Sequence, residues 1–133
     1  MKTMQTKSAD STMHNLVAVY GTLRKGHHNH SKYMRTAVFR GYIKITDRYK
    51  MYSLGHFPAV VKAEGFDVYA EVYSVSDIAF KRLDSLEGYP TMYDREQIST
   101  PYGDAWIYYM KEDPNAKLIQ DGDWVKFSDK NSF

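Results

Sequence analysis

The sequence contains no cysteine among its 133 residues. That absence excludes disulfide bonds, thiolate catalysis and zinc sites built on cysteine. It also favours a reducing compartment, so we expect a cytoplasmic protein. The chain also lacks a large excess of charge of one sign, because its formal net charge is only +2. Without a dense run of Lys and Arg to follow phosphates, nucleic acid is not an expected partner.

Long hydrophobic runs are missing as well. No apolar stretch approaches the ~20 residues that a membrane-spanning helix needs, so no membrane association is expected. The first 14 residues are polar and lack the apolar segment of a secretory signal. We therefore interpret residues 1–14 as a flexible N-terminal tail and residues 15–133 as a single domain.

Aromatic residues, by contrast, are abundant: they make up 15% of the chain, and 12 of them are Tyr. Several segments alternate between apolar and polar residues or form short apolar runs bounded by turns, which is typical of strands. Many strands with few helices predict an α+β fold built on a curled sheet or small barrel. We expect strands at Leu16–Tyr20, Tyr42–Met51, Ala59–Val61, Phe66–Val75 and Trp124–Phe127, a hairpin at Tyr93–Ser99 and Ala105–Met110, and a short helix at His30–Ala37.

One longer helix is expected from Ser76 to Glu87. Ser76 is a favourable N-cap, and Asp77 suits the first turn of a helix. Gly88 fits the position after the C-cap, and Pro90 prevents the helix from continuing.

The last residue of this helix, Glu87, carries a carboxylate. At about 100° per residue it falls within about 20° of Phe80 and about 40° of Leu83, inside the apolar stripe. Burial and the negative end of the helix would both raise the pKa of Glu87, which suits proton transfer near neutral pH. The alternative is a Glu at the edge of the stripe that reaches water or pairs with an Arg.

The loop that follows the first strand begins Tyr20-Gly21-Thr22-Leu23-Arg24. A glycine there allows backbone N–H groups to approach a ligand and to hold a carboxylate or a developing oxyanion. The segment is not a phosphate-binding P-loop, because no G-x-x-x-x-G-K-[ST] is present. The alternative interpretation is an ordinary turn.

Two segments together resemble the γ-glutamylcyclotransferase-like family, which includes γ-glutamylamine cyclotransferases and AIG2-like proteins. They are VYGTLRKGHHNH at Val19–His30 and RLDSLEGYPTMYDR at Arg82–Arg95. Phe57–Val60 and Ala70–Tyr73 also look like segments of this family, although Ala70 stands where a Gly is common. The resemblance spans Leu16 to Met110 and implies a small mixed β-barrel with few flanking helices.

The resemblance also implies a reaction, in which the α-amine of a γ-glutamyl substrate attacks its own γ-carbonyl and releases 5-oxoproline and a free amine. It requires no cofactor and no metal. Glu87 would be the catalytic acid/base. The resemblance assigns substrate binding to Tyr20, Gly21, Thr22, Leu23, Tyr93 and one tyrosine of the Tyr108-Tyr109 pair, for which we choose Tyr109. It assigns bracing of the loop to Arg24 and Asn29.

Other residues that could carry chemistry have simpler interpretations. The run His27-His28-Asn29-His30 has no carboxylate at the usual ligand spacing, so a loop is favoured over a metal site. Glu71 is a rival carboxylate, and we expect it to pair with a basic group such as Arg24. Asp84 and Asp94 are expected to be solvated. The expected partner is a small γ-glutamyl compound, and the expected state is a monomer or weak homodimer. A non-catalytic module that binds a metabolite or a partner in the same cavity stays open as the alternative.

Overall fold

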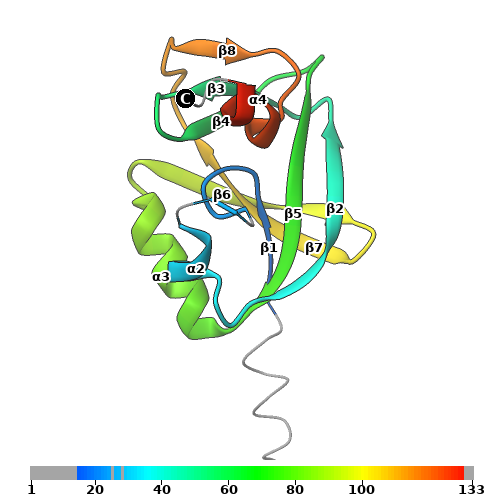
Figure 1. The fold of residues 1–133 in the computed structure, drawn as a ribbon, viewed down its shortest axis with the longest axis vertical. Helices are drawn as coiled ribbons and strands as arrows, with labels where there is room; N and C mark the ends of the chain where they lie inside the picture. The colour runs from blue at the N-terminus through cyan, green and yellow to red at the C-terminus, as the bar shows by residue number, and fades with distance from the viewer. Residues whose placement is uncertain (1–14, 25, 28, 131–133) are drawn as a thin grey trace, which may run out of the picture.

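The strands form two hydrogen-bonded sheets in a computed structural model that describes residues 15–24, 26–27 and 29–130 (Figure 1). The predicted tail at 1–14 lies outside the described residues, as do Lys25 and His28 of the loop. The larger sheet has the strand order β2-β5-β1-β7-β6. Its strands are β1 (Asn15–Val19), β2 (Val38–Thr46), β5 (Asp67–Val75), β6 (Tyr93–Thr100) and β7 (Gly103–Met110).

The smaller sheet has the strand order β4-β3-β8 and lies at the upper end of the molecule in Figure 1. Its strands are β3 (Tyr49–Ser53), β4 (Pro58–Lys62) and β8 (Lys117–Ile119). Three helices complete the described part of the chain: α2 (His30–Tyr33), α3 (Asp77–Glu87) and α4 (Trp124–Lys130). The predicted α+β class, with many strands and few helices, is confirmed.

The central strand β1 is buried on both faces, because one hydrophobic cluster packs against each face. It pairs antiparallel with β5 and parallel with β7. Val17 and Val19 pack in the cluster that contains Leu83 of α3. Ala18 packs with Tyr20 in the cluster that includes residues of the smaller sheet. Because the side chains alternate, the chain leaves β1 between the two halves of the core.

Helix α3 begins and ends where the sequence predicts. The Ser76 hydroxyl oxygen accepts a hydrogen bond of 3.0 Å from the backbone N–H of Ala79. At the other end Gly88 adopts the left-handed conformation with φ of 65°, and its N–H donates to the last carbonyls of the helix. This cap fixes Glu87 as the final helical residue, so its side chain leaves the helix at the edge of the core.

The predicted strand at Trp124–Phe127 is wrong, because this segment forms helix α4. The Asp123 carboxylate accepts a 3.3 Å hydrogen bond from the Lys126 N–H, which caps the first turn. The rings of Trp124 and Phe127 stack with centroids 5.5 Å apart, a spacing that suits residues three apart on a helix.

Two other boundaries differ from expectation. The segment predicted as one strand from Tyr42 to Met51 is divided between β2 and β3, with a turn at Asp47, whose φ is 64°. Helix α2 ends at Tyr33, earlier than the predicted Ala37.

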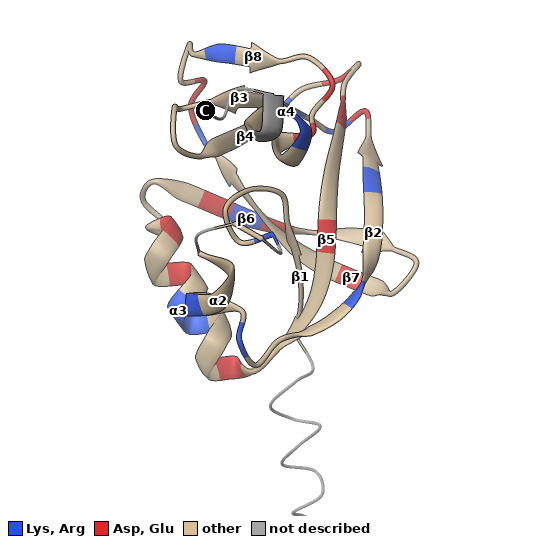
Figure 2. Cartoon of the chain, in the orientation of Figure 1, with Lys and Arg blue, Asp and Glu red and all other residues tan. Residues whose placement is uncertain are grey.

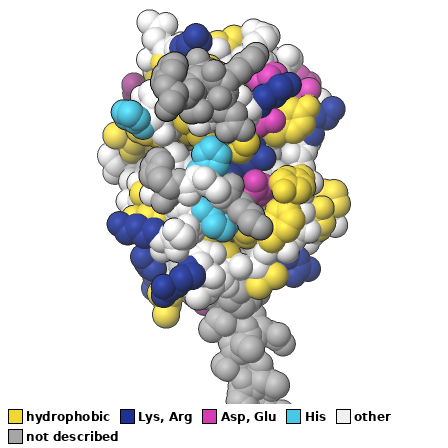
Figure 3. Space-filling model, viewed as in Figure 1, with side chains coloured by type: hydrophobic (Ala, Val, Ile, Leu, Met, Phe, Trp, Pro, Cys, Tyr) yellow, Lys and Arg dark blue, Asp and Glu magenta, His cyan; other side chains and the backbone are white. Residues whose placement is uncertain are grey.

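Charged side chains are scattered over β2, β6, β8 and the helices rather than gathered on one element (Figure 2). Hydrophobic side chains gather on the right of Figure 3, the side of β2, where Val38, Phe39 and Tyr42 are exposed. In the part of the chain that the structure describes, no helix combines the length and apolar character needed to cross a membrane.

Candidate active site

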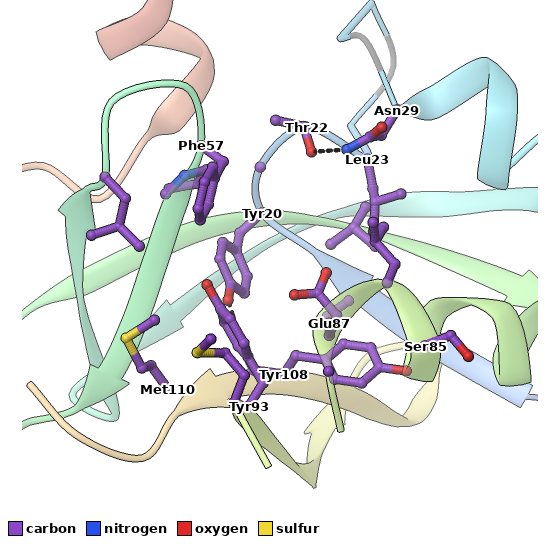
Figure 4. Close-up of a pocket in the computed structure, with 18 residues that line it drawn as sticks. Tyr20, Thr22, Leu23, Asn29, Phe57, Ser85, Glu87, Tyr93, Tyr108 and Met110 are labelled. Carbon is purple, nitrogen blue, oxygen red and sulfur yellow. Dashed lines mark hydrogen bonds between the residues drawn. The ribbon is translucent and has the colours of Figure 1, made fainter. Parts of the chain in front are cut away.

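A cavity of about 460 Å³ opens between the loop after β1 and the end of α3. Such a volume is typical of a pocket for a small molecule. The cavity is also lined by residues of β6 and β7 and of the loop that leads into β4 (Figure 4). Segments that are far apart in the sequence therefore meet around one cavity. They include the loop after β1 and the end of α3, the two segments in which the sequence predicts functional residues.

The carboxylate of Glu87 points into this cavity (Figure 4). Within the described part of the chain, no group forms a hydrogen bond or an ion pair with it. Burial disfavours the charged form and raises the pKa of Glu87 from 4.5 to about 7. A carboxylate with this pKa exchanges a proton readily near neutral pH.

Three tyrosines surround Glu87 in the cavity: Tyr20, Tyr93 and Tyr108. Burial raises the pKa of each hydroxyl above its usual value, and the neighbouring Glu87 charge raises it further. All three therefore remain neutral near pH 7 and can donate hydrogen bonds. Tyr20 already donates one of 2.8 Å to the backbone carbonyl of Tyr108, which joins the end of β1 to β7.

The loop after β1 approaches the smaller sheet closely at Gly21. A Cβ atom added there would lie 2.6 Å from Cγ of Pro58, so the position excludes any side chain. No backbone carbonyl of the described residues accepts a hydrogen bond from the N–H groups of Gly21, Thr22 or Leu23. These three residues line the cavity, and their N–H groups are therefore available to an anionic ligand group.

Asn29 holds the loop in place from its far end. Its side-chain amide donates a hydrogen bond of 2.8 Å to the Thr22 hydroxyl, which Figure 4 shows as a dashed line. Its backbone N–H donates to the Thr22 carbonyl at 3.1 Å. His30 also contacts the loop, with Nδ1 2.9 Å from the Leu23 carbonyl oxygen.

The predicted pairing of Arg24 with Glu71 is confirmed, and it ties the loop to β5. Arg24 Nε lies 2.9 Å from Glu71 Oε2, and both side chains are buried. Arg24 Nη1 lies 3.2 Å from Asp123 Oδ1, and the Tyr73 hydroxyl donates to Glu71 Oε1 at 2.8 Å. Glu71 is thus engaged outside the cavity lining, which leaves Glu87 as the carboxylate that faces the hollow.

Asp84 is not solvated as expected. Arg95 Nη1 donates to both of its oxygens, at 2.8 and 2.9 Å, and the Tyr108 hydroxyl donates to Oδ1 at 2.6 Å. The guanidinium of Arg95 also lies over the rings of three aromatic residues, with 4.3–4.6 Å from its central carbon to the ring centres of Phe80, Tyr89 and Trp106. Sequence reasoning missed this assembly because its partners come from α3, β6 and β7.

The choice of Tyr109 as a cavity residue is wrong, since the cavity is lined by Tyr108. Neighbouring residues on a strand point to opposite faces, so only one of the pair can face the hollow. Tyr109 packs near Tyr49 and donates to Asp94 at 3.3 Å, so Asp94 also has a side-chain partner. Had the inward face of β7 been known, alternation would have selected Tyr108.

Comparison with known families and proteins agrees with this geometry. A family model described as gamma-glutamyl cyclotransferase, AIG2-like, matches residues 17–126. The gamma-glutamylcyclotransferase family protein YtfP of Escherichia coli is 41% identical over 110 residues, which cover 82% of this chain and 95% of that protein. The match therefore includes both the loop after β1 and the end of α3.

Solved structures show the same fold. The crystal structure of an uncharacterized protein from Pyrococcus horikoshii superposes with a TM-score of 0.77 and 34% identity, covering 87% of this chain and 94% of that one. The solution structure of Escherichia coli YtfP superposes with a TM-score of 0.68 and 37% identity, covering 85% and 98%.

Proposed function

The chain belongs to the gamma-glutamyl cyclotransferase, AIG2-like family, and on that premise we propose that it converts a γ-glutamyl amide or peptide into 5-oxoproline and a free amine. Glu87 acts as the general acid/base, and the loop at Gly21–Leu23 holds the γ-glutamyl group. The observation that carries this proposal is the position of Glu87, whose carboxylate has no hydrogen-bond or ion-pair partner among the described residues and shares one cavity with that loop.

The reaction needs its two reacting groups brought together rather than an external nucleophile. The substrate's α-amine attacks its own γ-carbonyl carbon, a new C–N bond closes the five-membered ring, and the bond to the leaving amine breaks. Holding the γ-glutamyl chain folded can supply ~7–11 kcal/mol of the barrier. A cavity of about 460 Å³, lined by three tyrosines around Glu87, suits such positioning.

Proton transfer is the remaining task. The α-amine enters as an ammonium and attacks only after losing a proton, which Glu87 accepts. The nitrogen of the leaving group must gain a proton as its bond to carbon breaks, and Glu87 returns it there. A pKa of about 7 allows one carboxylate to perform both steps near neutral pH.

In the described part of the cavity lining, hydrogen-bond donors are the groups that can stabilise negative charge on the substrate. The N–H groups of Gly21, Thr22 and Leu23 can bind the α-carboxylate or the oxyanion that develops on the γ-carbonyl. The neutral hydroxyl of Tyr93 is a further donor in the same cavity. The Tyr108 hydroxyl already donates its proton to Asp84.

The replacement Glu87→Gln tests the role of the carboxylate. The amide keeps the size of the side chain but cannot exchange the proton, so we expect turnover to fall at least 10²-fold while 5-oxoproline still binds. Glu112→Gln is the matched control, because Glu112 is exposed and lies outside the cavity lining. Release of 5-oxoproline from γ-glutamyl compounds measures turnover, and calorimetry measures binding.

Two results would count against the proposal in different ways. Turnover of Glu87→Gln equal to that of the unmodified protein would remove Glu87 from the mechanism. If the unmodified protein released no 5-oxoproline from any γ-glutamyl peptide, amine or aminoglycoside-like amine, a binding module that uses the same cavity would be the better interpretation.

A further inference from the structure

A second hollow lies on the outer side of the molecule, where helices α2 and α3 pack side by side (Figure 1). This groove has a volume of about 480 Å³ and is lined by Tyr33 of α2 and by Ile78, Lys81, Arg82, Ser85 and Leu86 of α3. The α3 residues are exposed and recur at helical spacing, so they form one stripe along the outer face of the helix. Ser85 and Leu86 also line the cavity, so the groove ends beside the cavity.

Positive charge gathers at this groove. Lys81 and Arg82 line it, and the central carbon of the Arg82 guanidinium lies 5.3 Å from the centre of the Tyr33 ring. Nζ of Lys32 lies 5.4 Å from the centre of the same ring. Lys32, Lys81 and Arg82 are therefore the cations of the groove, and Figure 2 shows the basic segments of α2 and α3 next to each other.

The carboxylates of α3 do not neutralise this charge. Asp77 accepts a hydrogen bond of 2.7 Å from the side-chain amide of Asn15, Asp84 is bound by Arg95, and Glu87 points into the cavity. None of the three lines the groove. Among the described residues, the cations of the groove have no ion-pair partner. Cations held close together without counterions attract a ligand that carries negative charge.

The groove also offers exposed apolar surface. Ile78 is 75% exposed and Leu86 is 37% exposed, and both line the groove. They are eight residues apart on α3, which places them about 12 Å apart along the helix axis, with the cations between them. Apolar side chains exposed together in a groove mark a surface that a partner covers. The complementary ligand therefore combines carboxylates with apolar side chains over about two helical turns.

Three other occupants fit the groove less well. Nucleic acid would pair with the cations but leave Ile78 and Leu86 exposed to water. A lipid bilayer presents a broad surface, which does not enter a groove between two helices. Residues 1–14 of the chain contain two Lys and one Asp, so they do not supply an excess of carboxylates.

From these observations we infer that the groove between α2 and α3 is a docking site for an acidic segment of a partner protein. The carboxylates of the segment pair with the cations of the groove, and its apolar side chains cover Ile78 and Leu86. An amphipathic helix laid into a groove is a common form of peptide recognition, and complementary charge sets its specificity. The inference does not depend on the proposed reaction, because docking requires no γ-glutamyl substrate.

A labelled peptide tests the groove in the full chain. The probe is a fluorescein-labelled peptide of three Glu-Glu-Leu-Leu units, and fluorescence anisotropy measures its binding. We expect binding that weakens as the salt concentration rises, because exposed charge pairs are screened. Matched peptides of three Lys-Lys-Leu-Leu or three Glu-Glu-Ser-Ser units should bind at least tenfold more weakly, since the first lacks carboxylates and the second lacks apolar side chains.

Substitutions locate the binding on the protein. Lys81→Glu/Arg82→Glu should weaken binding of the acidic peptide at least tenfold, because attraction becomes repulsion. Arg40→Glu/Lys44→Glu is the matched control, since both side chains are exposed on β2 and the net charge changes by the same amount. This control should change the affinity less than twofold. Ile78→Ser should also weaken binding although it changes no charge.

Several results would overturn the inference. They include no binding of the acidic peptide, and equal losses in the two double variants, which would assign the binding to net charge alone. Tighter binding to phosphatidylserine vesicles or to an oligothymidylate, lost in Lys81→Glu/Arg82→Glu, would assign the groove to a membrane or to nucleic acid. A dimer that sedimentation detects and the same double variant dissociates would assign it to a second copy of this chain.

Discussion

The hydroxyl of Tyr108 donates a hydrogen bond of 2.6 Å to the carboxylate of Asp84. Tyr108 lines the cavity from β7, and Asp84 lies three residues before Glu87 on α3. The contact therefore joins one wall of the cavity to the last turn of the helix that carries Glu87. Arg95, bound to the same carboxylate, completes the connection from β6.

Arg95→Met should destabilise the protein because it leaves the partly buried Asp84 without its cation. We expect a loss of about 3 kcal/mol in the free energy of unfolding, at the low end for a broken buried pair. Arg48→Met is the matched control, since Arg48 is 3.9 Å from Glu96 and its side chain is 47% exposed. It should cost at most about 1 kcal/mol. Urea unfolding measures both, and similar losses would contradict the role assigned to Arg95.

The pKa of Glu87 predicts the pH dependence of turnover. As the base that accepts the proton of the substrate, Glu87 must be ionised, so kcat/KM should fall as the pH drops through about 7. Initial rates of 5-oxoproline release from pH 4 to 8 locate the midpoint. A midpoint near 4.5, the ordinary value for Glu, would show that burial does not raise the pKa of this group in solution.

The same pKa predicts how stability changes with pH. Between pH 4.5 and about 7 the folded protein keeps the proton of Glu87 while the unfolded chain releases it. The folded state then binds more protons, so the contribution of Glu87 to stability is present below pH 4.5 and is lost as the pH rises through about 7. The full shift is equivalent to roughly 3 kcal/mol. We expect the free energy of unfolding to change by about 2 kcal/mol rather than by the full amount, because the carboxylate reaches the open cavity, where water screens part of the effect.

Glu87→Gln has no such proton to lose. Its free energy of unfolding, relative to that of the unmodified protein, should therefore rise by about 2 kcal/mol between pH 4.5 and 8. Urea unfolding at several pH values measures this difference, and Glu112→Gln serves as the control. A difference that stays constant with pH would mean that Glu87 titrates alike in the folded and unfolded states.

The features that sequence reasoning located depend on local rules. Helix α3 was predicted from Ser76, Gly88 and Pro90, because capping is decided by residues within one turn. The position of Glu87 followed from the period of that helix. The pairing of Arg24 with Glu71 was also predicted, although it joins a loop to a strand 47 residues away.

The features that sequence reasoning missed depend on which face of a helix or strand turns inward. The sequence alone does not distinguish Tyr108 from Tyr109, because the inward face of β7 is decided by its pairing with β1 and β6. The environment of Asp84 depends on Arg95, which arrives from a different strand. The segment of helix α4 is predicted as a strand because a short apolar run fits both periods. The hydrogen bond from the Lys126 N–H to Asp123 that caps the helix is seen in the structure.

Gly21 offers a test of the loop geometry. Gly21→Ala would place a Cβ atom 2.6 Å from Cγ of Pro58, which forces the loop away from the smaller sheet. The N–H groups of Thr22 and Leu23 would move with it, so we expect kcat/KM to fall at least tenfold. A displacement of about 1 Å at a binding group is enough for losses of this size or greater.

The double variant Gly21→Ala/Pro58→Ala separates loop displacement from loss of the glycine itself. Removing the Pro58 ring eliminates both close contacts, so the loop can return and kcat/KM should recover relative to Gly21→Ala alone. Pro58→Ala by itself gives the fourth corner of the cycle and accounts for the lost cavity wall. If Gly21→Ala has no effect on kcat/KM, or if its effect and that of Pro58→Ala simply add, the close contact between loop and sheet does not set the position of the binding groups.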